Sequence, residues 1–181
     1  MTPISTDIYV DSGVYVSEDA KKKFSGGLDV NLKELKQAAA AFGSVNINWV
    51  FGDLETAGIG TDLLDLAVFN ASLAYFPERR SALENCMKQL KDGGEIHILD
   101  TPVYRNVEQK AARTRSEQYF EKAGAPQMKQ FYHPVCYDEL NEWYTDMLYD
   151  PGKWYHKIPF VSRSPFHWFR IMKNSSSFHK S

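Results

Sequence analysis

Three apolar runs, each followed by a polar side chain, decide the fold of this 181-residue chain. Residues 24–31 read FSGGLDVN, residues 47–55 read INWVFGDLE, and residues 64–73 read LDLAVFNASL. Short apolar runs of this kind are typical of buried strands. In an open α/β sheet the ligand binds outside the carboxyl ends of the strands. The three runs therefore predict a sheet with a ligand site at the edge where these polar residues lie.

Helix and strand signals alternate along most of the chain, which predicts an α/β fold with a doubly wound, mostly parallel sheet. Asn31 and Glu34 resemble a capping box at the start of a helix. Further elements are predicted over residues 77–90, 95–100, 107–122, 137–149 and 166–172. We expect one domain over residues 1–173 and a disordered C-terminal tail over residues 174–181.

Composition excludes several classes of function. The 21 basic and 23 acidic side chains give a formal net charge of −2, which argues against a nucleic-acid partner. No apolar stretch approaches the ~20 residues of a membrane helix, and residues 1–5 lack the pattern of a signal peptide. Cys86 and Cys136 have no partner at metal-ligand or redox spacing, and no His, Cys, Asp and Glu set has metal-ligand spacing. We expect a cytoplasmic protein without a membrane partner or a metal.

Asp29 is the strongest single candidate for a binding residue. An acidic side chain at the end of a second strand can accept both hydroxyl protons of a ribose. The structural alternative is a carboxylate that supports the N-terminus of the following helix. Asp53 and Asn70 have similar alternatives, because Gly-Asp is a common turn dipeptide and Asn caps loops and helices.

As an ordered series, these segments resemble the class I S-adenosylmethionine-dependent methyltransferases of the small-molecule type, the methyltransferase type 11 group. The likeness is most continuous from Asp65 to Asp100, through a strand, an Asn-Ala-Ser-Leu loop, a helix, a Lys-Asp-Gly-Gly turn and a second strand. It covers roughly residues 7–173. The resemblance implies a Rossmann-like sheet of seven strands with an antiparallel last strand, and S-adenosyl-L-methionine as cofactor.

The resemblance also implies a set of cofactor contacts. Asp29, with Val30 beside it, matches the residue that holds the ribose, and Asp53 and the amide of Leu54 match the adenine contacts. The loop after the next strand passes near the methyl donor. The implied cofactor residues are Asp7, Gly13, Asp29, Val30, Asp53, Leu54, Asn70, Ala71 and Ser72.

The glycine-rich first motif of the family is eroded. The preferred register places Asp7 at the acidic position and Gly13 at the last glycine, with Tyr9 and Asp11 in place of two glycines. A second register starts at Asp11 and leaves the first helix too short. If the loop needs positive φ, each replacement costs about 1–2 kcal/mol in strain. Together they would weaken binding by roughly 30-fold to 1000-fold. A truncated reading frame, a degenerate protein and a divergent but functional loop all remain open.

His133 and His156 lie in the aromatic-rich C-terminal third, which in the family forms part of the acceptor site. Histidine titrates near neutral pH, so either residue could act as a general base. The alternative is that these segments only pack, because aromatic side chains bury large areas. No catalytic residue is required, since the sulfonium already supplies the leaving group.

The predicted function is methyl transfer from S-adenosylmethionine to an unidentified small-molecule acceptor. One alternative is a non-catalytic, degenerate or truncated domain that kept the fold and serves as an interaction or scaffold protein. Another is a nucleotide-dependent oxidoreductase, which would need a Gly-x-Gly-x-x-Gly turn about 20 residues before Asp29. The chain has no such turn. The oligomeric state stays open.

Overall fold

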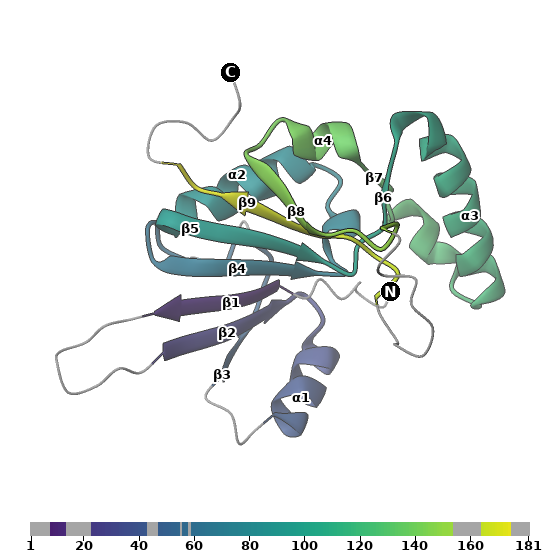
Figure 1. The fold of residues 1–181 in the computed structure, drawn as a ribbon. Coiled ribbons are helices and arrows are strands. Elements are labelled where there is room, and N and C mark those ends of the chain that lie inside the picture. Colours follow the sequence, from purple (N-terminus) through teal and green to yellow (C-terminus); the bar gives the residue numbers. More distant parts are fainter. Residues whose placement is uncertain are drawn as a thin grey trace, which may run out of the picture.

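The computed structural model describes residues 8–13, 23–42, 47–54, 56–57, 59–153 and 164–174, with the backbone path alone for 8–13 and 23–25. Secondary structure accounts for most of these residues (Figure 1). The elements are β1 (Ile8–Gly13), β2 (Lys23–Asp29), α1 (Leu32–Ala41), β3 (Ile47–Phe51), β4 (Leu64–Asn70), η1 (Leu73–Tyr75), α2 (Arg79–Gln89), β5 (Leu90–Leu99), β6 (Val103–Tyr104), η2 (Asn106–Glu108), α3 (Gln109–Lys122), η3 (Pro126–Gln130), β7 (Val135–Cys136), α4 (Tyr137–Asn141), β8 (Thr145–Tyr149) and β9 (Trp168–Met172).

Within the described residues, seven strands form one sheet in the order β3-β2-β1-β4-β5-β9-β8. β2 pairs parallel with β3, and β4 pairs parallel with β5, whereas β1 is antiparallel to β2 and β4, and β9 is antiparallel to β5 and β8. The predicted α/β class is confirmed, and the last strand is antiparallel as predicted. The sheet is mixed, however, because two of its six strand pairings are parallel.

The direction of β1 corrects the prediction of a parallel first strand that ends in a cofactor loop. In Figure 1 the β1 arrow points opposite to those of β4 and β5. β1 ends at Gly13 and β2 begins at Lys23, so nine residues connect them. A parallel pair needs a crossover of about a dozen residues or more, whereas an antiparallel pair needs only a short turn. The short connection therefore accounts for the reversed strand.

The core lies between the sheet and the helices α2 and α4, and we call this side of the sheet the inner face. Paired positions of β4, β5 and β9 place Phe69, Ile98 and Phe169 in one row of it, all at most 3% exposed. Two ion pairs join α2 to α4, Arg79 with Glu139 at 2.6 Å and Arg80 with Glu142 at 3.0 Å. Each buried large apolar side chain contributes about 1.5–3 kcal/mol. This face therefore supplies most of the stability.

The opposite, outer face carries α1 over β2 and β3 (Figure 1). The β2–α1–β3 and β4–α2–β5 crossovers step in opposite directions along the sheet, so right-handed connections put their helices on opposite faces. None of the helices in the described ranges is long and apolar enough to cross a membrane.

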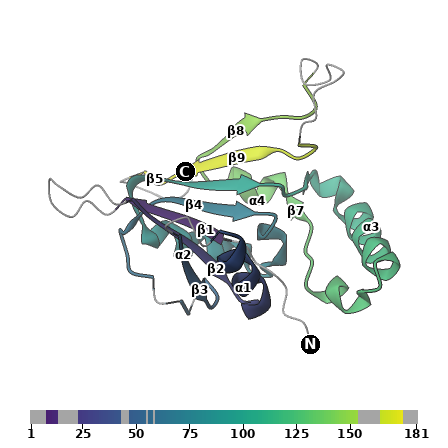
Figure 2. The same ribbon diagram turned by 90° about the horizontal axis from the view of Figure 1, so that it is seen from below.

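The segment from η2 to η3, which contains α3, lies beyond the end of the sheet. Figures 1 and 2 both show α3 past the arrowheads of β4 and β5. The short parallel pair of β6 and β7 brings the segments before and after α3 together. The helix predicted over residues 107–122 is confirmed by η2 and α3, and Gly124 follows it with a φ of +70°.

Two other boundaries differ from the prediction. The helix predicted over residues 137–149 ends at Asn141, and residues 145–149 form β8. The Thr145 hydroxyl donates to the Leu140 carbonyl oxygen at 2.6 Å, which satisfies a carbonyl of the last helical turn. The strand predicted over residues 95–100 begins earlier, at Leu90, because Leu90 already pairs with Leu64 of β4.

Gly27 of β2 lies under the Trp49 ring of β3, and a Cβ built there would come within 2.5 Å of Trp49 Cζ3. We expect Gly27→Ala to lower the free energy of unfolding by about 1–3 kcal/mol, because the ring must move. Urea denaturation would measure the change. Gly52→Ala is the matched control, since its nearest atoms lie at 3.7 Å. Equal stability of the two variants would contradict the predicted packing of β2 against β3.

Candidate functional site

The carboxyl ends of β2, β3, β4 and β5 meet at one edge of the sheet, because these strands share one direction. Two hydrogen bonds join neighbouring strand ends. The Gly52 amide donates to the Asp29 carbonyl at 3.1 Å, and the Ala71 amide donates to the Leu99 carbonyl at 2.9 Å. In an open α/β sheet this carboxyl edge is where ligands bind. We refer to it below as the carboxyl edge.

Asp29 ends β2 and is 3% exposed. Its Oδ1 accepts a hydrogen bond from the Asn31 amide at 2.6 Å. The Asn31 side chain caps α1 by accepting from the amides of Lys33 and Glu34 at 3.1 and 3.4 Å. Glu34 binds the Asn31 side chain at 2.8 Å, so the predicted capping interaction forms through the side-chain amide. Asp29 therefore supports the start of α1, and Val30 lies in this turn.

Asp53 follows β3 and organises a turn. Its Oδ1 accepts from the Thr56 amide and its Oδ2 from the Thr56 hydroxyl, both at 2.8 Å. The Ala57 amide donates to the Asp53 carbonyl at 2.9 Å. Leu54 is 2% exposed and belongs to the core. Asp53 therefore stabilises the turn after β3. The adenine-binding role of Asp53 and Leu54 stays a prediction.

The loop after β4 is strained and contains a buried polar atom that has no partner within the described part of the chain. Ala71, next to Asn70, has a φ of +53°. The Ser72 side chain is fully buried, and its Oγ has no hydrogen-bond partner among the described atoms. Backbone strain and unsatisfied buried polar groups are uncommon and collect at functional sites. Asn70, Ala71 and Ser72 therefore form the best-supported part of the candidate site.

Asp100 is a residue of this edge that the sequence prediction did not include in the site. It follows β5 with a φ of +48°, so two of the three described non-glycine residues with positive φ lie at neighbouring strand ends. Its Oδ1 accepts from the Ser164 hydroxyl at 3.1 Å. The available signal was its place at the end of an apolar strand, which it shares with Asp29.

Gly13 does not join this edge, which corrects its predicted role. Gly13 pairs with Lys23 at the start of β2, whereas Ile8 pairs with Leu28 near the end of β2. Asp29 lies six positions after Lys23, which corresponds to about 20 Å along a strand. Asp7 lies outside the described residues. The ends of β2, β3 and β4 thus lie at the carboxyl edge, and Gly13 at the end of β1 lies away from it.

His133 is attached to the strand-end loops through its backbone. Its amide donates to the Ala74 carbonyl at 2.8 Å, and its carbonyl accepts from the Arg79 guanidinium at 3.3 Å. Burial lowers the pKa of His133, and the charges of Arg79 and Arg113 lower it further. The imidazole is therefore neutral at pH 7 and able to accept a proton. His156, the other candidate base, lies outside the described residues.

Aromatic rings fill the space between α3 and the strand-end loops. Tyr132 makes edge-to-face contacts with Tyr75 and Phe120, with ring centroids at 5.6 and 5.7 Å. Burial raises the pKa of Tyr132 to about 12, and the nearby Tyr104 and Tyr75 add to the shift. Tyr132 also packs against the main core. The packing role of the aromatic residues is thus supported, and the raised pKa values of Tyr75 and Tyr132 keep both phenols protonated at neutral pH.

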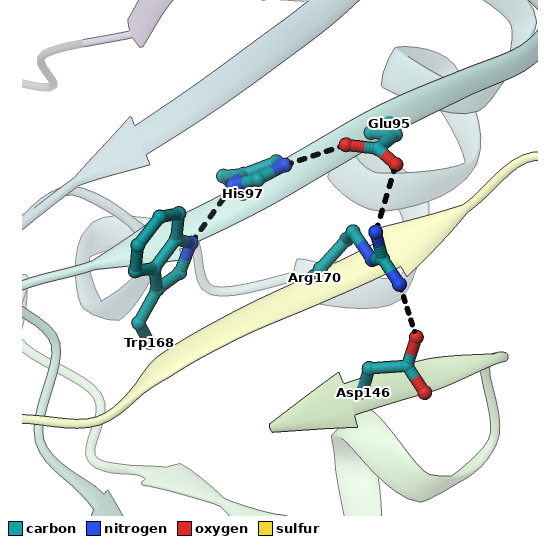
Figure 3. A network of polar contacts seen from close by, with 5 residues as sticks. All are labelled: Glu95, His97, Asp146, Trp168 and Arg170. Carbon is teal, nitrogen blue, oxygen red and sulfur yellow. Dashed lines mark hydrogen bonds and ion pairs between the residues drawn. The ribbon is translucent and has the colours of Figure 1, made fainter. Parts of the chain in front are cut away.

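A chain of polar contacts crosses β5, β9 and β8 on the outer face (Figure 3). The Trp168 indole donates to His97 Nδ1 at 2.8 Å, and His97 Nε2 contacts Glu95 at 2.9 Å. Arg170 donates to Glu95 at 3.2 Å and to Asp146 at 2.7 Å. Indole N–H is a donor only, so Nδ1 of His97 carries no proton and Nε2–H donates to Glu95. The network ties β5, β9 and β8 together and assigns His97 a structural role.

A cavity of about 90 Å³ lies between α2 and α4 on the inner face. Ligand pockets usually measure about 300–1,000 Å³, so this cavity is too small for a nucleoside cofactor. Its lining combines apolar side chains with the two ion pairs of α2 and α4. The lining residues are Leu73, Arg79, Arg80, Leu83, Val135, Glu139, Leu140, Glu142 and Trp143. Among the described residues, no group of three or more His, Cys, Asp and Glu could hold a metal ion.

Known proteins share both sequence and fold with this chain. A family model described as a methyltransferase domain matches residues 13–98. The resemblance to class I S-adenosylmethionine-dependent methyltransferases is confirmed. Uncharacterized methyltransferases of Mycobacterium tuberculosis (strain ATCC 25618 / H37Rv) and Mycobacterium bovis (strain ATCC BAA-935 / AF2122/97) are each 26% identical over 113 residues. The match covers 59% of this chain and 57% of each relative, so the chain spans less than two thirds of the methyltransferases it matches.

Two solved structures show the methyltransferase fold. The YcgJ protein of Bacillus subtilis superposes with a TM-score of 0.55 at 13% identity, over 68% of this chain and 54% of that protein. A methyltransferase of Methanosarcina mazei, described as SAM-dependent, gives a TM-score of 0.52 at 16% identity, over 82% of this chain and 81% of that protein. At these identities the likeness shows a Rossmann-like α/β fold. These comparisons do not identify the methyl acceptor.

Ala71→Gly tests the strain after β4. Relief of the positive φ should raise the free energy of unfolding by about 1–2 kcal/mol. The added backbone freedom of glycine in the unfolded state should lower it by about 0.5–1 kcal/mol. We expect unchanged or slightly greater stability in urea denaturation. Ala112→Gly, inside α3 and fully buried, should lose about 1 kcal/mol or more. A comparable loss in both variants would contradict the strained geometry of Ala71.

Nitrogen NMR of the histidine rings tests the network of Figure 3. We expect His97 to be the Nε2–H tautomer, because Trp168 requires an unprotonated Nδ1. Trp168→Phe should remove one indole N–H signal and thereby assign it. His167 serves as the comparison ring, since its Nε2 lies 3.1 Å from the Tyr137 hydroxyl and 3.5 Å from an Asp150 carboxylate oxygen, and no contact with Trp168 Nε1 is described for it. An Nδ1–H signal for His97 would show that Trp168 does not donate to it.

Proposed function

We propose that this protein transfers a methyl group from S-adenosylmethionine to a small-molecule acceptor. The observation that carries the proposal is the convergence of the β2, β3 and β4 ends, where the Gly52 amide binds the Asp29 carbonyl at 3.1 Å. The match to the methyltransferase domain over residues 13–98 spans these strand ends and supports the same assignment.

In this proposal each strand end holds one part of the cofactor. Asp29, with Val30, binds the ribose hydroxyls, and Asp53 and the Leu54 amide bind the adenine. A carboxylate has about four acceptor positions, so a second role beside the hydrogen bonds to Asn31 and Thr56 is chemically compatible. The Ser72 hydroxyl, buried next to the strained Ala71, is assigned to the end nearer the methyl donor.

The methionine end needs a different anchor from the family's glycine loop, because β1 is reversed. Its ammonium group is a cation, and Asp100 presents an exposed carboxylate at the end of β5. Charge-assisted hydrogen bonds are roughly twice as strong as neutral ones. We assign Asp100 this contact as part of the proposed function.

The acceptor side of the site lies toward α3. When bound, the cofactor supplies an electrophilic methyl group on a sulfonium that leaves as a neutral thioether. The methyl group would pass to an oxygen or nitrogen of the acceptor, whose proton would then need a base on this side of the site. We assign the neutral His133 imidazole as the base that takes the acceptor proton. Tyr75 and Tyr132 exclude water from that side.

Calorimetric titration with S-adenosylmethionine and S-adenosylhomocysteine tests the proposal. We expect both to bind and NAD not to bind. Asp29→Asn should weaken binding by about 10-fold or more, because hydrogen bonds to a charged group contribute about 1.5–3 kcal/mol. Asn retains an acceptor for the Asn31 amide, so the melting temperature should hold. Asp29→Ala should lose both binding and stability.

Asp65→Asn is the matched control, since Asp65 is exposed near the start of β4 and pairs with Lys91 at 2.8 Å. It should bind the cofactor like the unchanged protein. Absence of binding in the cooperatively folded protein would overturn the proposed function. Equal binding by Asp29→Asn would remove Asp29 from the site.

A further inference from the structure

We propose that Arg79 is a positioning residue of the candidate site, because its guanidinium joins the loop after β4, the segment that carries His133, and helix α4. This inference rests on the proposed function, in which His133 takes the acceptor proton. A base must lie within hydrogen-bond reach of the proton that it removes, so the segment that carries it needs a fixed place. Arg79 supplies that place through its side chain.

The Arg79 side chain is largely buried and binds acceptors on three segments. Arg79 begins α2, and its side chain is only 11% exposed. Its Nη1 donates to the carbonyl oxygens of Phe76 and His133, each at 3.3 Å, and its Nε donates to Glu139 at 2.6 Å. Phe76 follows η1, His133 precedes β7, and Glu139 lies in α4. A guanidinium presents its donors in a rigid fork, so it holds these acceptors at defined angles.

The backbone of His133 is held on both sides of its Cα atom. Its amide donates to the Ala74 carbonyl oxygen at 2.8 Å, and its carbonyl oxygen accepts from Arg79. Pro134 comes next in the chain and disfavours helical backbone angles at His133. The imidazole therefore extends from a fixed point beside the loop after β4.

Glu139 fixes the other side of the guanidinium. Its Oε1 accepts from the Cys136 amide at 2.9 Å, while its Oε2 accepts from Arg79. Arg79 also lines the cavity between α2 and α4, so on that side hydrogen bonds rather than close packing hold the guanidinium. One line of contacts thus runs from α4 through Glu139 and Arg79 to His133.

The neighbouring Arg80 shows that docking of α2 on α4 does not explain the contacts of Arg79. Arg80 also joins the two helices, through Glu142 at 3.0 Å, but its side chain is 61% exposed. The hydrogen bonds described for Arg80 go to Glu84 and Glu142. The two bonds from Arg79 to backbone carbonyls are therefore an addition to the ion pair between the helices.

Arg79 also affects the charge of the imidazole. Burial lowers the pKa of His133, and the positive charges of Arg79 on α2 and Arg113 on α3 lower it further. Glu139, the acidic group of α4 on this side, is paired with Arg79. A guanidinium nearby disfavours a second positive charge, so it favours the unprotonated imidazole that can accept a proton.

NMR of the full chain without cofactor tests the inference through the pKa of the His133 ring and the exchange rate of its amide hydrogen. Arg79→Gln removes both the charge and the fork. We expect a higher His133 pKa and amide exchange faster by about 10-fold or more, because hydrogen bonds to charged groups are among the stronger ones. Arg79→Lys keeps the charge and a partner for Glu139, so the pKa should stay low while amide exchange is still faster.

Thermal melts would show whether both variants fold, and Arg79→Lys carries the test of position if Arg79→Gln does not. Arg80→Gln is the matched control, since it removes an ion pair between the same helices, and it should change neither readout. Arg113→Gln should raise the His133 pKa without faster amide exchange.

Unchanged amide exchange in the folded Arg79 variants, or equal changes in Arg80→Gln, would overturn the inference. The NMR measurements need no cofactor, so this inference and the proposed function can fail separately. Absence of S-adenosylmethionine binding in calorimetry would overturn the proposed function and with it the role of Arg79 in the reaction. An unaffected His133 in a protein that binds S-adenosylmethionine would overturn the role of Arg79 alone.

Discussion

The strand β1 joins the two halves of the sheet, and the length of the connection after it decides its direction. β3 and β2 lie on one side of it, and β4, β5, β9 and β8 lie on the other. Its pairing with Leu28 and Phe69 aligns the two halves, so that the parallel strands on both sides end at the same edge. The candidate site exists because of this alignment. Nine residues before β2 are too few for a parallel crossover.

The same constraint divides the candidate site. Asp29, Asp53 and the loop from Asn70 come together at the carboxyl edge, whereas Gly13 lies at the opposite end of β2. The residues predicted to hold the adenosyl part of a cofactor therefore lie at one edge, whereas Gly13, predicted for the methionine end, lies away from it. The strained backbone at Ala71 and at Asp100 shows where the chain departs from relaxed geometry next to that edge.

The two faces of the sheet are held by different interactions. The inner face is apolar and packs against α2 and α4, whereas the outer face of β5, β9 and β8 carries the Glu95, His97 and Arg170 network. Partly exposed ion pairs contribute little stability singly, about 0–1 kcal/mol. Here their value is geometric, because one connected chain of hydrogen bonds sets the tautomer of His97 and the register of three strands.

Local pattern was sufficient for the class of fold and for much of the carboxyl edge. The strand runs that end near Asp29, Asp53 and Asn70, the cap at Asn31 and the long helix up to Lys122 all follow from residues close together in the sequence. The structure confirms the elements and brings the three strand ends to one edge. The roles of these residues toward a cofactor stay predictions, because hydrogen bonds within the turns already account for Asp29 and Asp53.

By itself, the sequence determined most of the strands and helices, because periodicity and capping depend on neighbouring residues. Only the tertiary structure decided the direction of β1, the separation of Gly13 from Asp29, and the conversion of residues 145–149 into β8. The alternation of apolar and polar residues along a strand is the same in both directions. The pattern therefore cannot show whether the strand runs parallel or antiparallel to its neighbours. Orientation depends on pairing with strands far away in the chain, and the edge at which each side chain arrives depends on that orientation.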